Sequence, residues 1–299
     1  MYIVKSPILF LIFNRPEETL KVFNAIRTVK PSKLYIAADG PRLQVKTDLF
    51  KCQESQKIIN LIDWDCEVKT LINEKNLGCK ISVSNSISWF FKNEGEGIIL
   101  EDDCLPCNDF FKFCDEMLSR YRYDNRIGHI SGSNFQNGIK RGIADYYYSK
   151  LTNVWGWASW RRVWDNYDIN MSSLDLFINE DVASVITIKK EVKKIINNNF
   201  LNTKKNLINT WDYQYFYSNL IHGFLSIIPN YNLVINIGFG EEATHTKDPS
   251  NFHSLKEFDN LPVQILHPKY FQSNMIADEY TFQSKPNNNI RRYLNKLFK

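Results

Sequence analysis

Three acidic residues stand together where a predicted strand ends. Glu101, Asp102 and Asp103 directly follow the apolar run 97–100, whose branched residues indicate a buried strand. Carboxylates crowded at a strand end repel one another and need a cation or a polar ligand beside them. Their oxygen atoms suit Mn²⁺ or Mg²⁺ that is also bound by substrate phosphates. A solvated acidic turn is the alternative interpretation.

Strand and helix signals alternate four times up to these acids. The predicted strands are 7–13, 33–38, 66–72 and 97–100, with helices at 16–27, 50–62 and 76–91. This alternation predicts an α/β fold, with a Rossmann-like, mostly parallel central sheet flanked by helices. In an open α/β sheet, ligands bind beyond the carboxyl ends of the strands. Neither G-x-G-x-x-G nor G-x-x-x-x-G-K-[ST] occurs, so side chains at strand ends and a metal would have to hold a nucleotide.

The second half of the chain has a different pattern. It predicts strands at 126–131, 146–149, 224–228 and 233–237, and helices at 110–123, 182–199 and 209–221. Trp155, Trp157, Trp160 and Trp164 follow one another at helix-like spacing, and most of this cluster is expected in the core. We expect residues 1–106 and 107–270 to be two halves of one domain, followed by a basic C-terminal tail at 271–299.

Composition limits the class of protein. The chain has 299 residues, of which 43% are hydrophobic and 23% charged, as in a soluble globular protein. The formal charge of +4 does not indicate a nucleic-acid-binding protein. No apolar run approaches the ~20 residues of a membrane span, and the run 8–13 is too short for a signal peptide. We therefore expect a cytoplasmic protein.

Two further features leave alternatives open. Cys104 and Cys107 form a C-x-x-C pair that allows zinc or redox chemistry, but free buried thiols are the preferred interpretation because no second ligand pair accompanies them. Apolar and basic residues alternate over 290–299. This pattern predicts a peripheral contact with an anionic membrane, and a disordered polar terminus is its alternative.

Six short motifs occur in a defined order. They are F-N-R-P at 13–16, A-D-G-P-R at 38–42, E-D-D-C-L-P at 101–106, W-G-W-A-S-W at 155–160, W-D-Y-Q at 211–214 and G-F-G-E-E-A-T-H at 238–245. Together they resemble GT-A glycosyltransferases of the inverting N-acetylglucosaminyltransferase I type. The chain more closely resembles bacterial sugar transferases labelled hemolysin HlpA-like. The resemblance covers roughly residues 5–250, and it is specific because all six motifs keep their order.

This resemblance implies roles for the acids and for one histidine. Asp103 would ligate the metal, Mn²⁺ or Mg²⁺, and His245 would bind the metal or the diphosphate. Asp102 would accept a hydrogen bond from a ribose hydroxyl or reach the ion through water, and Glu101 would accept one from a sugar hydroxyl. The alternatives are a strand-end packing role for Glu101 and a surface position for His245.

Other motif residues would bind the nucleotide sugar. Asn14, Arg15 and Asp39 follow neighbouring strands, where a carboxylate can bind the uracil ring and a guanidinium can bind phosphate. A salt bridge between Arg15 and Asp39 is the alternative. Arg42 would approach phosphate unless it is only solvated. Lys80 opens a predicted helix, whose N-terminus favours anions, unless it is a plain exposed lysine.

The downstream motifs would serve the donor sugar and the acceptor. Asp212 is the candidate general base, because an inverting transferase needs a carboxylate within reach of the acceptor hydroxyl; helix capping is its alternative role. Trp211 would screen water and hold the apolar face of the sugar. The stretch Trp155-Gly156-Trp157 would line the donor pocket, since glycine permits close backbone approach.

The resemblance therefore implies a metal-dependent inverting glycosyltransferase. It would transfer a sugar, first of all N-acetylglucosamine from UDP, to a hydroxyl of a surface polysaccharide or a lipid-linked glycan. Residues 1–106 would bind the donor and residues 107–270 the acceptor. A sugar nucleotidyltransferase and a non-catalytic glycan- or lipid-binding module are the alternatives. Retaining stereochemistry also stays open, because inversion depends on one assigned base.

Overall fold

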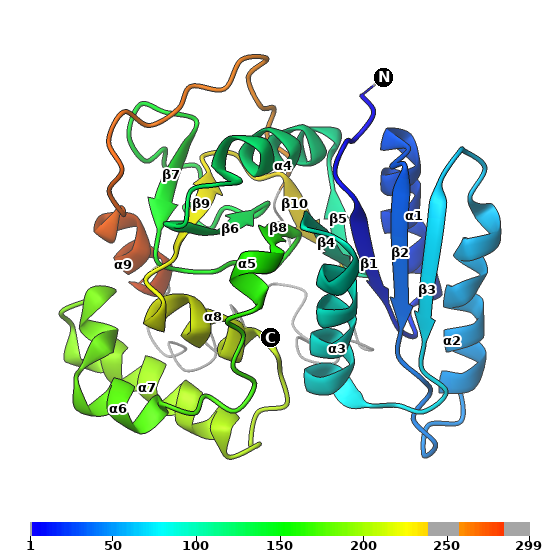
Figure 1. The fold of residues 1–299 in the computed structure, drawn as a ribbon, viewed down its shortest axis with the longest axis horizontal. Coiled ribbons are helices and arrows are strands. Elements are labelled where there is room, and N and C mark those ends of the chain that lie inside the picture. The colour runs from blue at the N-terminus through cyan, green and yellow to red at the C-terminus, as the bar shows by residue number, and fades with distance from the viewer. Residues whose placement is uncertain (1, 239–256, 284–299) are drawn as a thin grey trace.

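A central sheet of eight strands organises the chain (Figure 1). The computed structural model describes residues 2–238 and 257–283, so His245 and the predicted membrane-binding residues 290–299 lie outside the described part. The strand order is β3-β2-β1-β4-β8-β6-β9-β7. The pairs β1/β2, β1/β4, β2/β3 and β6/β9 are parallel, and the other three are antiparallel. The predicted α/β class is confirmed.

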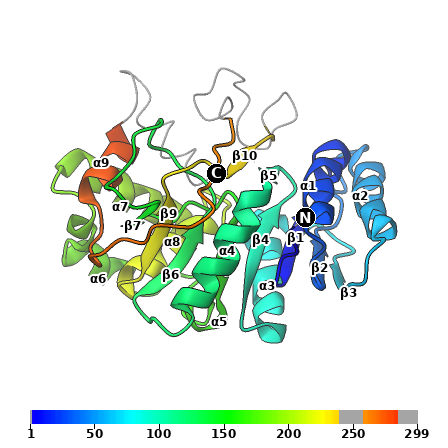
Figure 2. The ribbon, with the colours of Figure 1, turned by 90° about the horizontal axis from the view of Figure 1, so that it is seen from above.

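The N-terminal half forms the parallel part of the sheet. Its elements are β1 (Ile8–Ile12), α1 (Pro16–Val29), β2 (Lys33–Ala38), α2 (Asp48–Gln56), a 3₁₀ turn (Lys57–Leu61), β3 (Glu67–Ile72), α3 (Gly78–Asn93) and β4 (Glu96–Glu101). Helices α1 and α2 cover one face and α3 the other (Figure 2). The strand order reverses between β1 and β4, so a crevice opens beyond their carboxyl ends.

Helix α1 illustrates how local sequence sets these boundaries. Pro16 begins the helix, where its missing N–H costs nothing. Glu17 and Glu18 lie in the first turn, where their negative charge interacts favourably with the helix dipole. Lys30 ends the helix in the left-handed conformation, with φ 43°. Arg15 therefore lies on the short connection between β1 and α1, directly at the crevice.

The C-terminal half extends the same sheet. Its elements are α4 (Asn108–Tyr121), β6 (Ile127–Ser131), β7 (Tyr146–Ser149), β8 (Trp157–Trp160), α5 (Arg161–Trp164), α6 (Leu174–Asn179), a 3₁₀ turn (Val182–Val185), α7 (Lys190–Lys204), α8 (Asp212–Ile221), β9 (Leu225–Pro229) and α9 (Met275–Gln283). The helix expected at 182–199 is wrong in its bounds, because a 3₁₀ turn precedes α7. Residues 275–283 of the predicted tail form α9, whose Asp278 accepts a hydrogen bond from Ser149 at the end of β7.

The tryptophan-rich stretch contains a strand that the helix-like spacing did not predict. Strand β8 lies between β4 and β6 and is antiparallel to both. All four of its residues are buried, and Trp157 is 0% exposed. The tryptophans have helix-like spacing because Trp157 and Trp160 lie in β8 and Trp164 lies in α5, which follows the strand without a loop. The expectation that these tryptophans belong to the core is confirmed.

A two-stranded antiparallel sheet adjoins the acidic cluster. It pairs β5 (Cys104–Pro106) with β10 (Val234–Asn236). This pairing brings Gly238 against Asp103, where a Cβ atom on the glycine would lie only 2.4 Å from the Asp103 Oδ2. Gly238 is therefore required for this close approach.

Among the described residues, no helix has both the length and the apolar character needed to cross a bilayer. All six cysteines are free thiols, and Cys52, Cys104 and Cys114 are buried.

Candidate functional site

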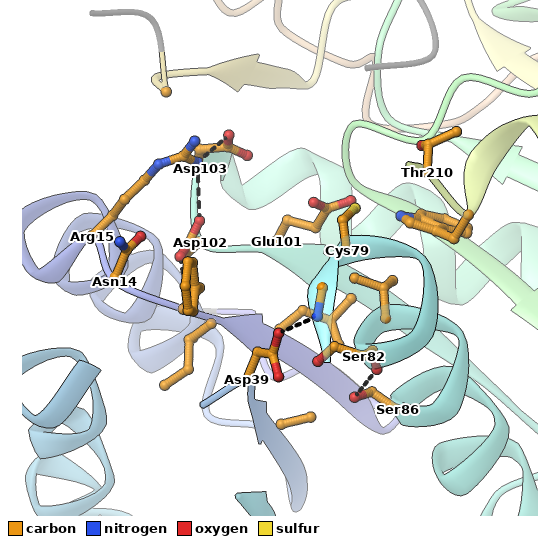
Figure 3. A pocket seen from close by; sticks show the side chains of 18 of the residues that line it. Asn14, Arg15, Asp39, Cys79, Ser82, Ser86, Glu101, Asp102, Asp103 and Thr210 are labelled. Carbon is orange, nitrogen blue, oxygen red and sulfur yellow. Dashed lines mark hydrogen bonds and ion pairs between the residues drawn. The ribbon is translucent and has the colours of Figure 1, made fainter. Parts of the chain in front are cut away.

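A cavity of about 340 Å³ lies where the carboxyl ends of β1, β2 and β4 face the starts of α3 and α8 (Figure 3). Its lining includes ten of the residues singled out in the sequence. These are Asn14, Arg15, Asp39, Arg42, Glu101, Asp102, Asp103, Trp155, Trp211 and Asp212. The crevice at the reversal of strand order is therefore the candidate site.

Arg15 and two of the acids form a partly buried ion cluster. The Arg15 Nη1 atom lies 3.3 Å from Asp102 Oδ1 and 2.6 Å from Asp103 Oδ2. The backbone N–H of Phe13 donates to the second oxygen of Asp102 at 2.9 Å. The expected alternative of an Arg15–Asp39 salt bridge is wrong, because Arg15 is paired with the acidic cluster instead. Residues after β1 and β4 are thus joined directly.

Carboxyl groups outnumber cationic side chains in this cluster. Burial raises the pKa of Asp102 to about 7, against the opposing effect of Arg15. Burial also raises the pKa of Glu101 well above its ordinary range, and Asp103, Asp102 and Asp212 raise it further. Within residues 2–238 and 257–283, no hydrogen-bond donor reaches the Glu101 carboxylate. The site therefore favours the arrival of an additional cation.

Asp39 joins the end of β2 to the start of α3. Its two oxygens accept hydrogen bonds from the backbone N–H groups of Leu77 and Gly78, at 3.0–3.2 Å. They also accept from the Nδ2 atoms of Asn73 and Asn76, at 3.2 and 2.9 Å, and from the N–H of Gly40. A carboxylate offers about four lone-pair sites. These protein donors therefore leave Asp39 little capacity to accept a further hydrogen bond from a ligand. The geometry indicates that Asp39 positions α3, whereas the role in uracil binding stays a prediction.

Arg42 and Asn14 share a carboxylate that the sequence reading did not single out. Asp48 is 1% exposed and accepts from Arg42 Nε at 2.5 Å and from Arg42 Nη2 at 2.9 Å. Asn14 Nδ2 donates to the same carboxylate at 2.8 Å. The hydrogen bond with Arg42 lowers the pKa of Asp48. The guanidinium also lies 5.4 Å from the centre of the Phe13 ring. Arg42 is therefore a side chain of the pocket wall that is anchored by Asp48 and remains 34% exposed.

The start of α8 supplies the opposite wall. Asp212 is 3% exposed and accepts hydrogen bonds from the Thr210 hydroxyl and from the Tyr213 N–H, the latter at 2.9 Å. Trp211, and not Asp212, occupies the N-cap position of the helix. The indole of Trp211 stacks on that of Trp157, with 5.7 Å between ring centres. Asp212 is thus held rigidly in the pocket by its neighbours.

Cys79 is a pocket residue that the sequence reading missed. Figure 3 shows its side chain beside Glu101. Burial raises the pKa of the Cys79 thiol well above its ordinary value, and Glu101 and Asp212 raise it further. Other residues missed in the lining are Asn76, Ser82, Ser86, Asn209, Thr210 and Asn236. Four of these residues stand at or within two residues of a recognised motif or predicted helix start: Asn76, Asn209, Thr210 and Asn236. No such signal marks Ser82 and Ser86.

Three predicted residues lie outside the pocket lining. Lys80 donates through its Nζ to Asn206 Oδ1 at 3.1 Å, on the surface. Trp157 is a core residue under Trp211. Gly156 has φ +60°, and a Cβ atom there would lie 2.7 Å from a methyl group of Val234. Gly156 therefore serves the packing of β10, and sugar binding by these three residues stays a prediction.

The acids suit a hard cation that shares its coordination with a ligand. Within the described ranges, no group of three His, Cys, Asp or Glu residues has the spacing of a complete metal centre. Mg²⁺ is often held by one or two carboxylates together with waters and substrate phosphates. The surplus of carboxylate oxygens around Asp103 fits such a partial site. His245, the other expected ligand, is outside the described residues.

Comparison with known proteins does not assign the chain to a family. No protein-family model matches the chain, and no curated protein matches it. Among solved structures, the chain is similar to HddC from Yersinia pseudotuberculosis, with a TM-score of 0.31 and 9% sequence identity. That match covers 56% of this chain and 80% of the HddC chain. Similarity at this level gives no information about function.

Proposed function

We propose that this chain is a metal-dependent, inverting GT-A glycosyltransferase that uses a nucleoside diphosphate sugar. One observation carries the proposal: the crevice at the reversal of strand order contains three adjacent carboxyl groups, the guanidinium of Arg15 paired with two of them, and a facing buried aspartate. UDP-N-acetylglucosamine is the first donor to test, because the motifs at 101–106 and 155–160 resemble transferases of that type. The acceptor would be a hydroxyl of a surface polysaccharide or a lipid-linked glycan.

The charges of the cavity match the needs of the donor. A bound divalent ion would stabilise the charge that develops on the leaving diphosphate. Asp103 would hold that ion, with Asp102 beside it. Arg15 lies within reach of the same region and can donate to phosphate oxygens. Glu101 faces the cavity and can accept a hydrogen bond from a sugar hydroxyl.

Asp212 is the proposed general base. Deprotonation of the acceptor hydroxyl requires a positioned carboxylate on the acceptor side of the sugar. The hydrogen bonds from Thr210 and Tyr213 fix the Asp212 carboxylate at the pocket wall. Trp211 is 2% exposed and stacks on Trp157, so it forms a rigid apolar surface that can exclude water next to the base.

Hydrolysis of the donor tests this function. The wild-type protein should slowly hydrolyse its own nucleotide sugar with Mn²⁺, and a panel of donors would identify which one. Asp103→Ala should reduce this rate about 100-fold or more, the size typical for loss of a group that stabilises transition-state charge. Arg122→Gln is a suitable control, because Arg122 pairs with Glu96 at the opposite end of β4. Absence of turnover with every donor would instead favour a glycan- or lipid-binding module.

A further inference from the structure

Arg15 occupies the place between carboxylates that a cation would take. Its Nη1 atom contacts Asp102 and Asp103 at the same time, at 3.3 and 2.6 Å. The three side chains are only 19%, 9% and 16% exposed. Figure 3 shows the guanidinium joined by dashed lines to the side chains of Asp102 and Asp103. A single positive charge thus bridges two acids in a poorly hydrated setting.

The chain places Arg15 where its side chain can turn without unfolding an element. Arg15 precedes the first helical residue of α1, and its φ of −122° and ψ of 76° lie outside the helical region. Its carbonyl oxygen accepts from Thr19 N at 2.9 Å, so the backbone stays fixed to the helix. The long side chain can therefore exchange partners while the backbone remains in place.

A divalent ion held by these carboxylates would compete with Arg15 for their oxygen atoms. Two cations at one carboxylate repel each other strongly in a partly buried site, because little water screens them. The planar guanidinium also matches the oxygens of a diphosphate as well as those of a carboxylate. The diphosphate of a donor would lie beside the metal and so offers Arg15 a new partner at short range.

We infer that Arg15 is a built-in substitute for the divalent ion, which yields the carboxylates to the metal and transfers its own contacts to the donor diphosphate. This inference rests on the proposed function. Binding of the metal would release Arg15 for the diphosphate, and binding of the diphosphate would hold Arg15 away from the carboxylates. Each ligand would therefore raise the affinity of the protein for the other. In the absence of nucleotide, Arg15 keeps the metal affinity low.

Calorimetric titration with Mn²⁺ alone tests the inference. Arg15→Gln should bind Mn²⁺ about tenfold or more tightly than the wild-type protein, although it has lost a residue of the pocket. UDP should raise the Mn²⁺ affinity of the wild-type protein by a larger factor than that of Arg15→Gln. Arg15→Lys keeps the charge without the planar fork and should bind Mn²⁺ with intermediate affinity. Arg122→Gln makes the same change in net charge away from the pocket and should behave as the wild-type protein does.

The possible results separate the two proposals. Equal or weaker Mn²⁺ binding by both Arg15 variants would overturn the inference, and the proposed function would stand if the wild-type protein still hydrolysed a donor. Failure of every form to bind Mn²⁺, with and without UDP, would overturn the proposed function and the inference with it. Circular dichroism checks that each variant is folded. If Arg15→Gln does not fold, Arg15→Lys serves as the test.

Discussion

Removal of the Asp39 carboxylate should disturb both the stability of the protein and the shape of the pocket. Asp39 is 8% exposed and connects the end of β2 with the N-terminus of α3. Asp39→Ala leaves the N–H groups of Leu77 and Gly78 without their acceptor. The side-chain amides of Asn73 and Asn76 lose one acceptor each but keep Ser82 Oγ and the Gly40 carbonyl. Because α3 carries part of the pocket wall, its first turn should shift.

The size of the effect follows from the number of these donors. Loss of a helix-capping acceptor costs about 1 kcal/mol, and each buried donor left unpaired costs about 1–3 kcal/mol. Leu77 is 43% exposed, and Asn76 and Gly78 are only partly buried, so water can replace some of the lost bonds. We therefore expect Asp39→Ala to lower the free energy of unfolding by about 2–4 kcal/mol. Asp39→Asn keeps one oxygen acceptor and should lose about half as much.

Urea denaturation measures this difference. Asp63→Ala is a matched control, because Asp63 is an exposed carboxylate whose partner is Arg27, and its loss should cost less than about 1 kcal/mol. Nucleotide-sugar affinity should fall in Asp39→Ala and not in the control. The reasoning is refuted if Asp39→Ala unfolds within about 0.5 kcal/mol of the wild-type protein, since the carboxylate would then not hold the two elements together.

Three further predictions concern single side chains. Gly238→Ala puts a Cβ atom 2.4 Å from the Asp103 Oδ2 and should weaken Mn²⁺ binding about tenfold in a calorimetric titration; Gly95→Ala, with no atom within 4 Å, should not. Asp212→Asn should reduce sugar transfer about 10²–10⁴-fold while Mn²⁺-dependent donor binding persists, and full transferase activity would exclude Asp212 as the base. Burial raises the pKa of Asp278 from 3.8 to about 6. The proton on this carboxyl group therefore stabilises the fold fully below pH 3.8, and roughly 3 kcal/mol is lost as the pH rises through 6. Urea stability measured against pH should show a smaller fall in Asp278→Asn, and parallel profiles would contradict this.

Local patterns in the sequence were sufficient to predict the N-terminal half of the sheet. Strands β1, β2, β3 and β4 and the helices between them follow from runs of apolar residues and from helix-start signals such as Pro16. The acids at 101–103 were predictable as a cluster because they are adjacent. Their position at the carboxyl edge of the sheet follows from the parallel topology.

Contacts between distant residues could not be predicted in the same way. Strand β5 exists only because residues 104–106 pair with 234–236. Strand β8 is buried on both faces, so its aromatic residues show no alternation of polar and apolar positions. The bond from Asn14 to Asp48 joins the connection after β1 to the first residue of α2. No local signal marks such pairs, since their geometry depends on how the whole sheet is assembled.

Binding of nucleotide sugars to the wild-type protein and to Asp103→Ala, with and without Mn²⁺, tests the central claim most directly. We expect one nucleoside diphosphate sugar to bind saturably to the wild-type protein only when Mn²⁺ is present, and Asp103→Ala to lose this dependence on the metal together with the affinity. Equal binding by the two proteins, or binding that is indifferent to Mn²⁺, would contradict a metal-bridged donor site at the acidic cluster.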